Sequence, residues 1–538
     1  MQQKTNDITK PDASQKKKKL IVVLISAAFL LASLVIAFLI FKDVFSYELK
    51  HAYTADSPLY WTVGRGILNG LKPYLEMYEN KPVGVFLISA LSFAVTGETI
   101  LCNIVSIISV MLIAFVPALA LLDRYRKDEN IDTLRKAAVV LTVFLSCIFL
   151  AVYTEMRSGA FQVEAIGAAF SVLFICLVYK LGRSQTKKER IILTVLASLA
   201  ICCAVMLKEP FLLGAVFGAL LFVDNFKDLL KNLVIPCVGG GIIAVIGLAA
   251  GGVLVPYFSI YCKRMFETRI SGSRTTTVKA FEPQRIFDNV KQFSVWLLIL
   301  LILFAVLALV SVIIKKKSVP AILFHVFKVA AALAAAIFSV GVARYYYSHH
   351  FIFAVPVYCA FLICGGEALC ELLPKKIAVS ATVFLLWGAV LVSVIPFIGC
   401  KYWGDYTVKY KALTEKAAYV DELLDFYGED RYQFIGFNGE DVFIGSTKHS
   451  PQGPVFGQDS DNFQSADTWF SQKLLEQIDN SNIVIVKEYL SPAINEQIQN
   501  KLATSFTESP AVPFRNAPPQ DFNYKVYYRI ATFGLLNR

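Results

Sequence analysis

Charged side chains are scarce in this sequence of 538 residues. Asp, Glu, Lys and Arg make up 17% of it, whereas a typical soluble protein contains about 25%. Hydrophobic residues make up 56%, and long apolar runs recur over the first 400 positions. Because about 20 apolar residues span the hydrocarbon core of a bilayer, the sequence predicts a polytopic membrane protein and excludes a soluble globular one.

The sequence also lacks the usual motifs of nucleotide-binding and zinc enzymes, since it contains no P-loop, GxGxxG, HExxH or CxxC. None of its eleven cysteines follows position 400, and nearly all lie in or beside apolar runs. This distribution excludes a disulfide framework and a zinc site of regular spacing. It indicates that the pair Cys202–Cys203 consists of small apolar packing residues.

Residues 1–19 form a basic N-terminus that ends in KKKK at 16–19. An apolar run follows at 20–41 without a small-residue cleavage site, so we expect a retained membrane span rather than a cleaved signal peptide. The net charge of +11 is compatible with a nucleic-acid partner, but Lys and Arg also concentrate in the cytoplasmic loops of membrane proteins. We therefore predict a cytoplasmic N-terminus and no nucleic-acid partner.

A transmembrane domain is predicted over residues 20–400. It contains about eleven spans, at 20–41, 99–122, 137–153, 159–180, 191–207, 211–223, 233–256, 292–314, 319–342, 350–370 and 377–399. The five later loops that face inward, at 123–136, 180–190, 224–232, 315–318 and 371–376, all contain Lys or Arg. This agreement with the positive-inside rule predicts an extracytoplasmic C-terminus.

Residues 82–97, PVGVFLISALSFAVTG, are apolar but short for a span. If they crossed the membrane, the RYRK at 124–127 would face outward and every later loop would invert. We therefore expect a juxtamembrane or re-entrant helix at the outer surface, where protein can cover irregular backbone. This helix closes a long outer stretch at 42–98.

The outer loop at 257–292 is basic, with seven Lys and Arg against three acidic residues. It could bind an anionic group, or it could be a solvated connector that touches lipid head groups. Two shorter outer segments are YTEMRSG at 153–159 and MLKEPF at 206–211.

Residues 401–538 have more charge and no long apolar run, which predicts a small extracytoplasmic α/β domain. Its expected helices are 411–427, 466–479 and 492–503, and its expected strands are 431–437, 482–488 and 523–531. The segment IVIVKE has the pattern of a buried strand. We expect this domain to cover the outer loops or to position an acceptor.

Asp56 is the leading candidate for chemistry in the stretch 42–98. It precedes Ser57–Pro58, which is typical of a helix start, so it could simply cap a helix over 57–70. The functional interpretation is favoured by Arg65 on the same helix and by Tyr60 and Trp61, which suit a membrane interface.

The segment DSPLYWTVGRGILNGLKPYLEMYENKPVGVFLISAL resembles the first outer loop of the GT-C superfamily of glycosyltransferases. It is most similar to the bacterial branch of protein O-mannosyltransferases and lipid A aminoarabinose transferases. That loop has an acidic residue, a Tyr, a G-x-x-PY turn and a Lys-Pro before an apolar helix. The matching residues are Asp56, Tyr60, Gly70, Pro73, Tyr74, Lys81 and Pro82. The resemblance implies a GT-C fold with Asp56 as the catalytic base.

Three further segments extend the resemblance, which covers residues 20–400 but not the C-terminal domain. SGAFQVEAIGAAFSVLF at 158–174 matches a second acidic site at Glu164, with Glu155 as an alternative, although Gly159–Ala160 stands where relatives have Gly-Asn. KEPFLLG matches an outer lysine at Lys208, and RYYYSHHFIFAVP places His349 at the position of a family histidine. His350 replaces a tyrosine of the family.

The resemblance implies an inverting glycosyltransferase of the bacterial cytoplasmic membrane. A sugar would move from a polyprenyl-phosphate donor to the hydroxyl of an envelope glycan, a glycolipid or a protein. Asp56 and Glu164 are the expected catalytic acids. The expected ligands of the donor phosphate are Lys208, Lys81, Arg65, Arg344 and His349. No cofactor is required, although a divalent metal between Asp56, Glu164 and a histidine is conceivable.

Three alternatives remain open from the residues themselves. Glu164 could only form an ion pair with Lys208 or Arg157, and His349 could be an interfacial hydrogen-bonding residue. The chain could also be a transporter or flippase of lipid-linked sugars, which would favour charged residues in mid-span and inverted repeats. Here the charged residues occur at outer span ends and no repeat is visible, which favours the enzyme.

Overall fold

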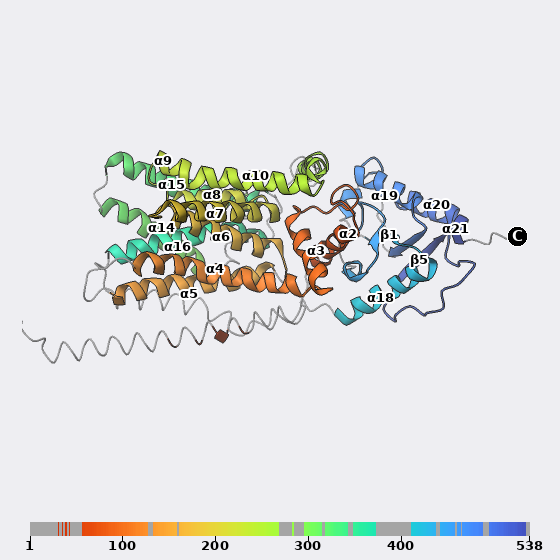
Figure 1. Ribbon diagram of the computed structural model, residues 1–538. Coiled ribbons are helices and arrows are strands. Elements are labelled where there is room, and N and C mark those ends of the chain that lie inside the picture. The colour runs from red at the N-terminus through yellow and green to blue at the C-terminus, as the bar shows by residue number, and fades with distance from the viewer. Residues whose placement is uncertain are drawn as a thin grey trace, which may run out of the picture.

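The computed structural model contains a bundle of long helices and a smaller domain of strands and helices at one end of it (Figure 1). Besides five isolated positions between 31 and 42, the structure describes residues 56–126, 133–158, 161–267, 282–284, 295–314, 318–342, 348–372, 410–436, 442–457, 460–463, 465–487 and 494–533. The predicted span 377–399 and most of the span 20–41 lie outside the described residues.

The bundle is formed by helices at the nine other predicted spans. They are α4 (Ile100–Arg126), α5 (Thr133–Ser158), α6 (Val163–Leu181), α7 (Lys187–Leu207), α8 (Phe211–Leu220), the run α9, η1 and α10 (Phe226–Ala250), α14 (Val295–Ile314), α15 (Val319–Gly341) and α16 (Val355–Leu372). Six helical segments among the described residues are long and apolar enough to cross a membrane. The chain is a multi-pass membrane protein.

The predicted span 211–223, which the sequence allowed to be broken or tilted, contains a short helix. α8 has 10 residues and is therefore about 15 Å long, half the thickness of a hydrocarbon core. The ammonium of Lys328 on α15 donates hydrogen bonds to the carbonyl oxygens of Leu221 at 3.2 Å and Val223 at 2.7 Å. A buried lysine thus satisfies carbonyl groups just beyond the end of α8.

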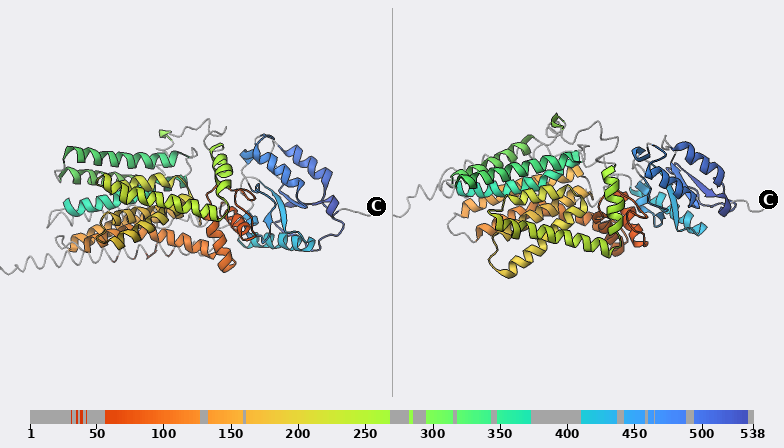
Figure 2. Two further views of the ribbon diagram at one scale, coloured as in Figure 1. Left: turned by 45° about the horizontal axis from the view of Figure 1, so that its top comes forward. Right: turned by 90° about the horizontal axis from the view of Figure 1, so that it is seen from above.

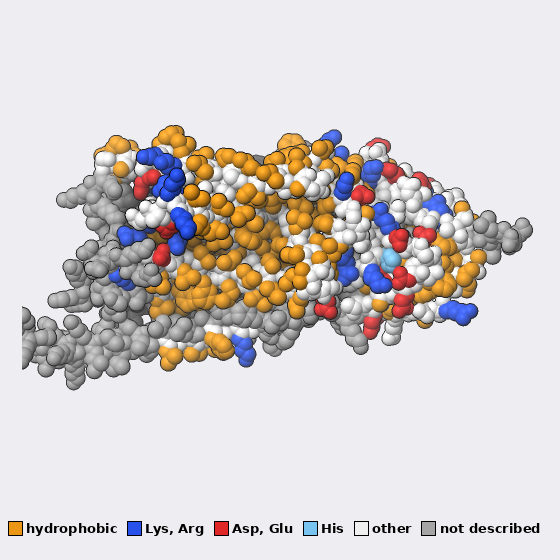
Figure 3. Space-filling model, viewed as in Figure 1, with side chains coloured by type: hydrophobic (Ala, Val, Ile, Leu, Met, Phe, Trp, Pro, Cys, Tyr) orange, Lys and Arg blue, Asp and Glu red, His pale blue; other side chains and the backbone are white. Residues whose placement is uncertain are grey.

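The two ends of the bundle differ in what they carry. The connection between α6 and α7 and the connection between α8 and α9 both lie at the end of the bundle far from the C-terminal domain (Figure 1). This agrees with the prediction that both loops face the side of the membrane opposite the C-terminal domain. Hydrophobic side chains cover the visible face of the bundle, and charged side chains gather at its ends (Figure 3). This distribution is typical of a protein whose middle faces lipid.

Two short helices lie between the bundle and the C-terminal domain. They are α2 (Ser57–Leu68) and α3 (Gly84–Thr96), and they lie across the end of the bundle in all three views (Figures 1 and 2). Three apolar side chains of α3, at Leu87, Leu91 and Val95, are more than half exposed. Their spacing of four residues places them on one face, as expected of a juxtamembrane helix that lies against lipid.

The C-terminal domain contains a five-stranded sheet with the strand order β2-β1-β3-β5-β4. Its strands are β1 (Arg431–Ile435), β2 (Ser450–Pro451), β3 (Ile483–Lys487), β4 (Phe506–Thr507) and β5 (Tyr524–Arg529). Strand β1 is parallel to β2 and β3, whereas β5 is antiparallel to β3 and β4. Its helices are α18 (Tyr410–Tyr427), α19 (Trp469–Asp479), α20 (Asn495–Ser505) and α21 (Ile530–Phe533). The six elements predicted from the sequence are all present.

The C-terminal domain packs directly on the outer stretch that contains Asp56. The amide of Tyr78 donates to the carbonyl oxygen of Pro454 at 2.9 Å, and the Asn69 side chain donates to the Ser450 hydroxyl at 3.0 Å. The Tyr78 ring also lies 5.7 Å from the ring of Trp469. Buried apolar residues of both parts form one continuous core, so the domain covers the outer stretch.

We expect the substitution Gly445→Ala to weaken this docking. A Cβ atom at Gly445 would lie 2.6 Å from the carbonyl oxygen of Pro58, an atom of the backbone that cannot move aside cheaply. Overpacking of this kind costs about 1–3 kcal/mol, so thermal unfolding of the purified protein should begin at a lower temperature. Gly241→Ala is the matched control, because open space surrounds that position. Equal stability of the two variants would contradict the close contact.

Candidate active site

Asp56 directly precedes α2, but its side chain does not cap the helix. Its side chain makes no capping hydrogen bond to the first turn of the helix. Instead, its Oδ2 atom accepts a hydrogen bond from the Tyr60 hydroxyl at 3.3 Å and lies 3.7 Å from the Lys81 ammonium. Its side chain is 49% exposed. The interpretation of Asp56 as a helix cap is therefore wrong, and its carboxylate is open to a ligand.

Tyr60 joins Asp56 to the neighbouring segment of the bundle. Its hydroxyl also lies 3.3 Å from the side-chain oxygen of Gln162. Burial, followed by the negative charge of Asp56, raises the pKa of Tyr60 well above its ordinary value. The phenol therefore stays protonated and able to donate. Tyr60 and Trp61 are fully buried, so the expectation that they face the membrane interface is wrong.

Lys81 lies between two carboxylates. Its ammonium lies 3.7 Å from Glu79 as well as from Asp56, and it donates to the Asn80 side chain at 2.9 Å. The Lys81 side chain is only 11% exposed. Both carboxylates attract the ammonium at this distance, so Lys81 orients Asp56 in addition to any contact with a substrate. Glu79, two positions before Lys81, was not among the site residues predicted from the sequence.

A second, more buried group of charges surrounds Glu164 at the start of α6. Its Oε1 atom accepts a hydrogen bond from Lys208, which follows α7, and lies 3.9 Å from the Nε2 atom of His349. The Glu164 side chain is 3% exposed, whereas that of His349 is 35% exposed. The pair with Lys208 that the sequence left open is thus formed, and Lys208 also lies 5.3 Å from the ring of Phe353.

Two strained backbone positions hold these groups in place. Tyr74 and Phe161 have φ angles of 68° and 50°, a region that costs non-glycine residues about 1–3 kcal/mol. The Tyr74 hydroxyl donates to the carbonyl oxygen of Lys81 at 3.0 Å, and the Phe161 amide donates to the Ser106 hydroxyl at 2.9 Å. Phe161 directly precedes Gln162, so both strained residues fix the backbone beside the cluster.

Glu209, which the sequence did not single out, connects the Lys208 segment to the helical run α11, η2 and α12 (Leu254–Met265). Its carboxylate accepts a hydrogen bond from the Tyr261 hydroxyl at 2.5 Å. Burial raises the pKa of Glu209, and this hydrogen bond opposes the rise. The Tyr261 ring in turn lies 4.9 Å from that of Tyr74. The only feature of the sequence that could have identified Glu209 as a site residue is its position beside Lys208 in an otherwise apolar region.

Five of the seven predicted site residues come together, one lies apart, and one lies outside the described residues. Asp56, Lys81, Glu164, Lys208 and His349 form the two connected groups described above. Arg65 lies in the last turn of α2, about 14 Å along the helix from Asp56, with its guanidinium 4.1 Å from the Phe93 ring. Arg344, the Glu155 side chain and most of the loop 257–292 lie outside the described residues.

A metal between Asp56, Glu164 and a histidine does not fit this arrangement. Within the part of the chain that the structure describes, no three His, Cys, Asp or Glu side chains gather so that they could hold a metal ion. The Lys208 ammonium contacts the Glu164 oxygen that such an ion would need. Lysine side chains supply the positive charge beside both carboxylates.

The whole fold is similar to that of a solved membrane protein. ArnT from Cupriavidus metallidurans bound to undecaprenyl phosphate matches with a TM-score of 0.50 and 12% identity, over 95% of this chain and 99% of that chain. ArnT is a lipid A aminoarabinose transferase of the GT-C superfamily. This chain has an ArnT-like fold. The predicted resemblance is thereby confirmed for the fold, which at this identity is all that the likeness establishes.

Two further GT-C structures match with lower scores. The apo state of the same ArnT gives a TM-score of 0.49 with 13% identity, over 96% of this chain and 100% of that chain. An oligosaccharyltransferase from Archaeoglobus fulgidus, in complex with Zn and sulfate, gives 0.39 with 12% identity, over 90% of this chain and 74% of that chain. No family profile and no curated protein matches the sequence.

Proposed function

We propose that this chain is an inverting glycosyltransferase that moves a sugar from a polyprenyl-phosphate donor to an acceptor hydroxyl at the outer face of the cytoplasmic membrane. One observation carries the proposal. Asp56, Lys81, Glu164, Lys208 and His349 come from four separate segments and form two groups of charges, which Tyr60 joins through its contacts with Asp56 and Gln162. Such a convergence of acids and bases beside lipid is typical of a functional site.

Asp56 is the proposed general base. The acceptor hydroxyl attacks the anomeric carbon of the sugar, and its proton passes to the Asp56 carboxylate as the new C–O bond forms. Half of the Asp56 side chain is exposed, so the acceptor can reach it. The hydrogen bond from Tyr60 and the neighbouring Lys81 ammonium hold the carboxylate in a fixed direction.

The proposed leaving group is the polyprenyl phosphate. As the bond between the anomeric carbon and the phosphate oxygen breaks, that phosphate gains negative charge, and fixed cations in a partly dry site stabilise it. Lys208 is 15% exposed at the edge of the buried group around Glu164, which leaves its ammonium reachable from outside. His349 supplies a second nitrogen beside it. One displacement without an enzyme nucleophile inverts the configuration at the anomeric carbon.

The choice of donor is supported by two features. ArnT, whose fold this chain shares, binds undecaprenyl phosphate in one of its solved structures. The sequence contains no nucleotide-binding motif, and a phosphate–sugar bond carries the energy of transfer without one. The acceptor hydroxyl belongs to a protein, a glycolipid or an envelope glycan.

The proposal predicts transfer from a lipid-linked sugar by the purified full-length protein in liposomes. We expect radiolabelled sugar to pass from a polyprenyl phosphate to acceptors of a membrane extract, with a product of inverted anomeric configuration by NMR. Heat-inactivated protein is the control. Retention of configuration would contradict the single displacement, and movement of the intact lipid-linked sugar across the bilayer without transfer would identify a flippase instead.

A further inference from the structure

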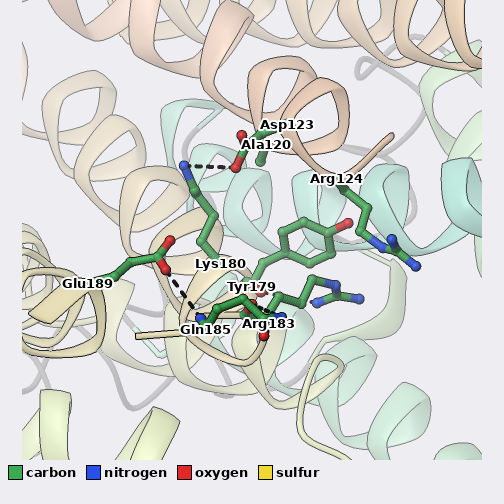
Figure 4. Close-up of a pocket in the computed structure, with 8 residues that line it drawn as sticks. All are labelled: Ala120, Asp123, Arg124, Tyr179, Lys180, Arg183, Gln185 and Glu189. Atoms are coloured by element: carbon green, nitrogen blue, oxygen red, sulfur yellow. Dashed lines mark hydrogen bonds and ion pairs between the residues drawn. The ribbon is translucent and has the colours of Figure 1, made fainter. Parts of the chain in front are cut away.

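A separate cavity lies at the end of the bundle opposite Asp56. It has a volume of about 300 Å³, within the range of small-ligand sites. Its walls come from the end of α4, the end of α6, the turn after α6 and the start of α7 (Figure 4). The lining residues are Ala120, Asp123, Arg124, Tyr179, Lys180, Arg183, Gln185 and Glu189. None of them belongs to the candidate active site.

Two arginines share one side of this cavity. The guanidinium groups of Arg124 and Arg183 extend on the same side of the Tyr179 ring (Figure 4). The guanidinium of Arg183 lies 3.9 Å from the centre of that ring, and it donates to the Tyr179 carbonyl oxygen and to Glu367, each at 3.0 Å. Arg183 is therefore held in a fixed position, and paired guanidinium groups are well suited to a phosphate.

The acidic residues of the lining are bound within the protein. Asp123 lies 3.2 Å from the Lys180 ammonium. Glu189 accepts a hydrogen bond from the Gln185 amide at 3.2 Å, while its own amide donates to the Thr186 hydroxyl at 3.1 Å. These two hydrogen bonds close the start of α7 much as a capping box does, except that the carboxylate accepts from the residue before the cap residue Thr186. The carboxylates consequently oppose an incoming anion less than free acids would.

Exposed apolar side chains begin within one helical turn of the cavity. Leu119 and Leu122 on α4 are 55% and 48% exposed, and Ile191 and Ile192 on α7 are 54% and 48% exposed. Seen from the side, charged groups at this end give way to an apolar surface over the bundle (Figure 3). The cavity thus lies where phospholipid head groups meet acyl chains.

We propose that this cavity binds the head group of an anionic phospholipid from the leaflet opposite the active site. Its phosphate lies between Arg124 and Arg183, and its acyl chains follow the exposed side chains of α4 and α7. Basic pockets between membrane helices are known to hold such head groups. A soluble anion would make no use of the adjoining apolar surface.

The proposal is tested by titrating the detergent-solubilised full-length protein with phosphatidylglycerol or phosphatidylcholine and counting bound lipid by native mass spectrometry. The wild type should bind phosphatidylglycerol more tightly. Arg124→Gln should weaken that binding about fivefold and the double variant with Arg183→Gln about 30-fold, because each cation at the membrane surface contributes a similar increment. Arg124 is exposed, so the single variant should fold even if the double variant does not.

Lys188→Gln is the matched control, because Lys188 is an exposed cation of α7 outside the lining. It should bind phosphatidylglycerol as the wild type does. Equal binding of the two lipids by the wild type, or undiminished binding by Arg124→Gln, would overturn the proposal. Displacement of the lipid by glycerol phosphate at the same concentration would also overturn it, because the site would then recognise a soluble anion.

Discussion

Replacement of Asp56 with Asn is expected to lower the rate of sugar transfer about 10²–10⁴-fold, the range lost when a general base is removed. Asn has the same shape and can still accept the hydrogen bond from Tyr60 that Asp56 accepts at 3.3 Å. The fold and the affinity for the lipid-linked donor should therefore change little. The measurement is a comparison of kcat and KM with a polyprenyl-phosphate sugar and a fixed membrane extract as acceptor.

Glu98→Gln is the matched control for this variant. Glu98 is an exposed acid of the same outer stretch, and its neutralisation removes the same charge without touching the cluster. It should transfer sugar at the wild-type rate. If Asp56→Asn transferred sugar at the wild-type rate, Asp56 would not be the general base. An equal loss of transfer rate in both variants would indicate a general effect of charge.

The substitution Lys208→Met should both destabilise the protein and reduce transfer. It leaves the carboxylate of Glu164, whose side chain is 3% exposed, without its closest positive partner. Removing one member of a buried ion pair costs about 3–5 kcal/mol. The double variant Glu164→Gln with Lys208→Met removes the buried charge as well, so its apparent melting temperature in detergent should return most of the way to that of the wild type.

The rate of sugar transfer by the double variant distinguishes a structural role of the pair Glu164–Lys208 from a functional one. If Lys208 stabilises the leaving phosphate, the double variant should remain slow even though its stability is restored. Recovery of transfer together with stability would mean that the pair only supports the fold. Lys473→Met serves as the control, because Lys473 pairs with Glu476 on the protein surface and such exposed pairs contribute about 0–1 kcal/mol.

Much of the architecture could be predicted from local patterns. The lengths of the apolar runs predicted helices at nine of the spans, although apolar composition alone did not show that α8 ends after 10 residues. The alternation of buried strands and amphipathic helices predicted six of the elements after residue 410, but not the short strands β2 and β4 or the short helix α21. The short run 82–97 was correctly expected to lie at the end of the bundle, because the charges of the later loops fixed the number of crossings.

The candidate site was predictable in its residues but not in its contacts. Motif positions selected Asp56, Glu164, Lys208 and His349, which do converge. They also selected Arg65, which faces Phe93 at the other end of α2. Helical periodicity did not distinguish these cases, because it places a residue on a face without showing what packs against that face.

The sequence by itself determined that this chain crosses the membrane, where its polar stretches interrupt the apolar ones, and which acids and bases lie at span ends. Each of these properties depends on a few neighbouring residues. Only the tertiary structure decided that Lys81 is shared by Asp56 and Glu79, that Tyr60 reaches Gln162 and that the C-terminal domain covers the site. Some of those contacts join segments that are far apart along the chain. Others depend on side-chain directions that only the packing of the folded protein fixes.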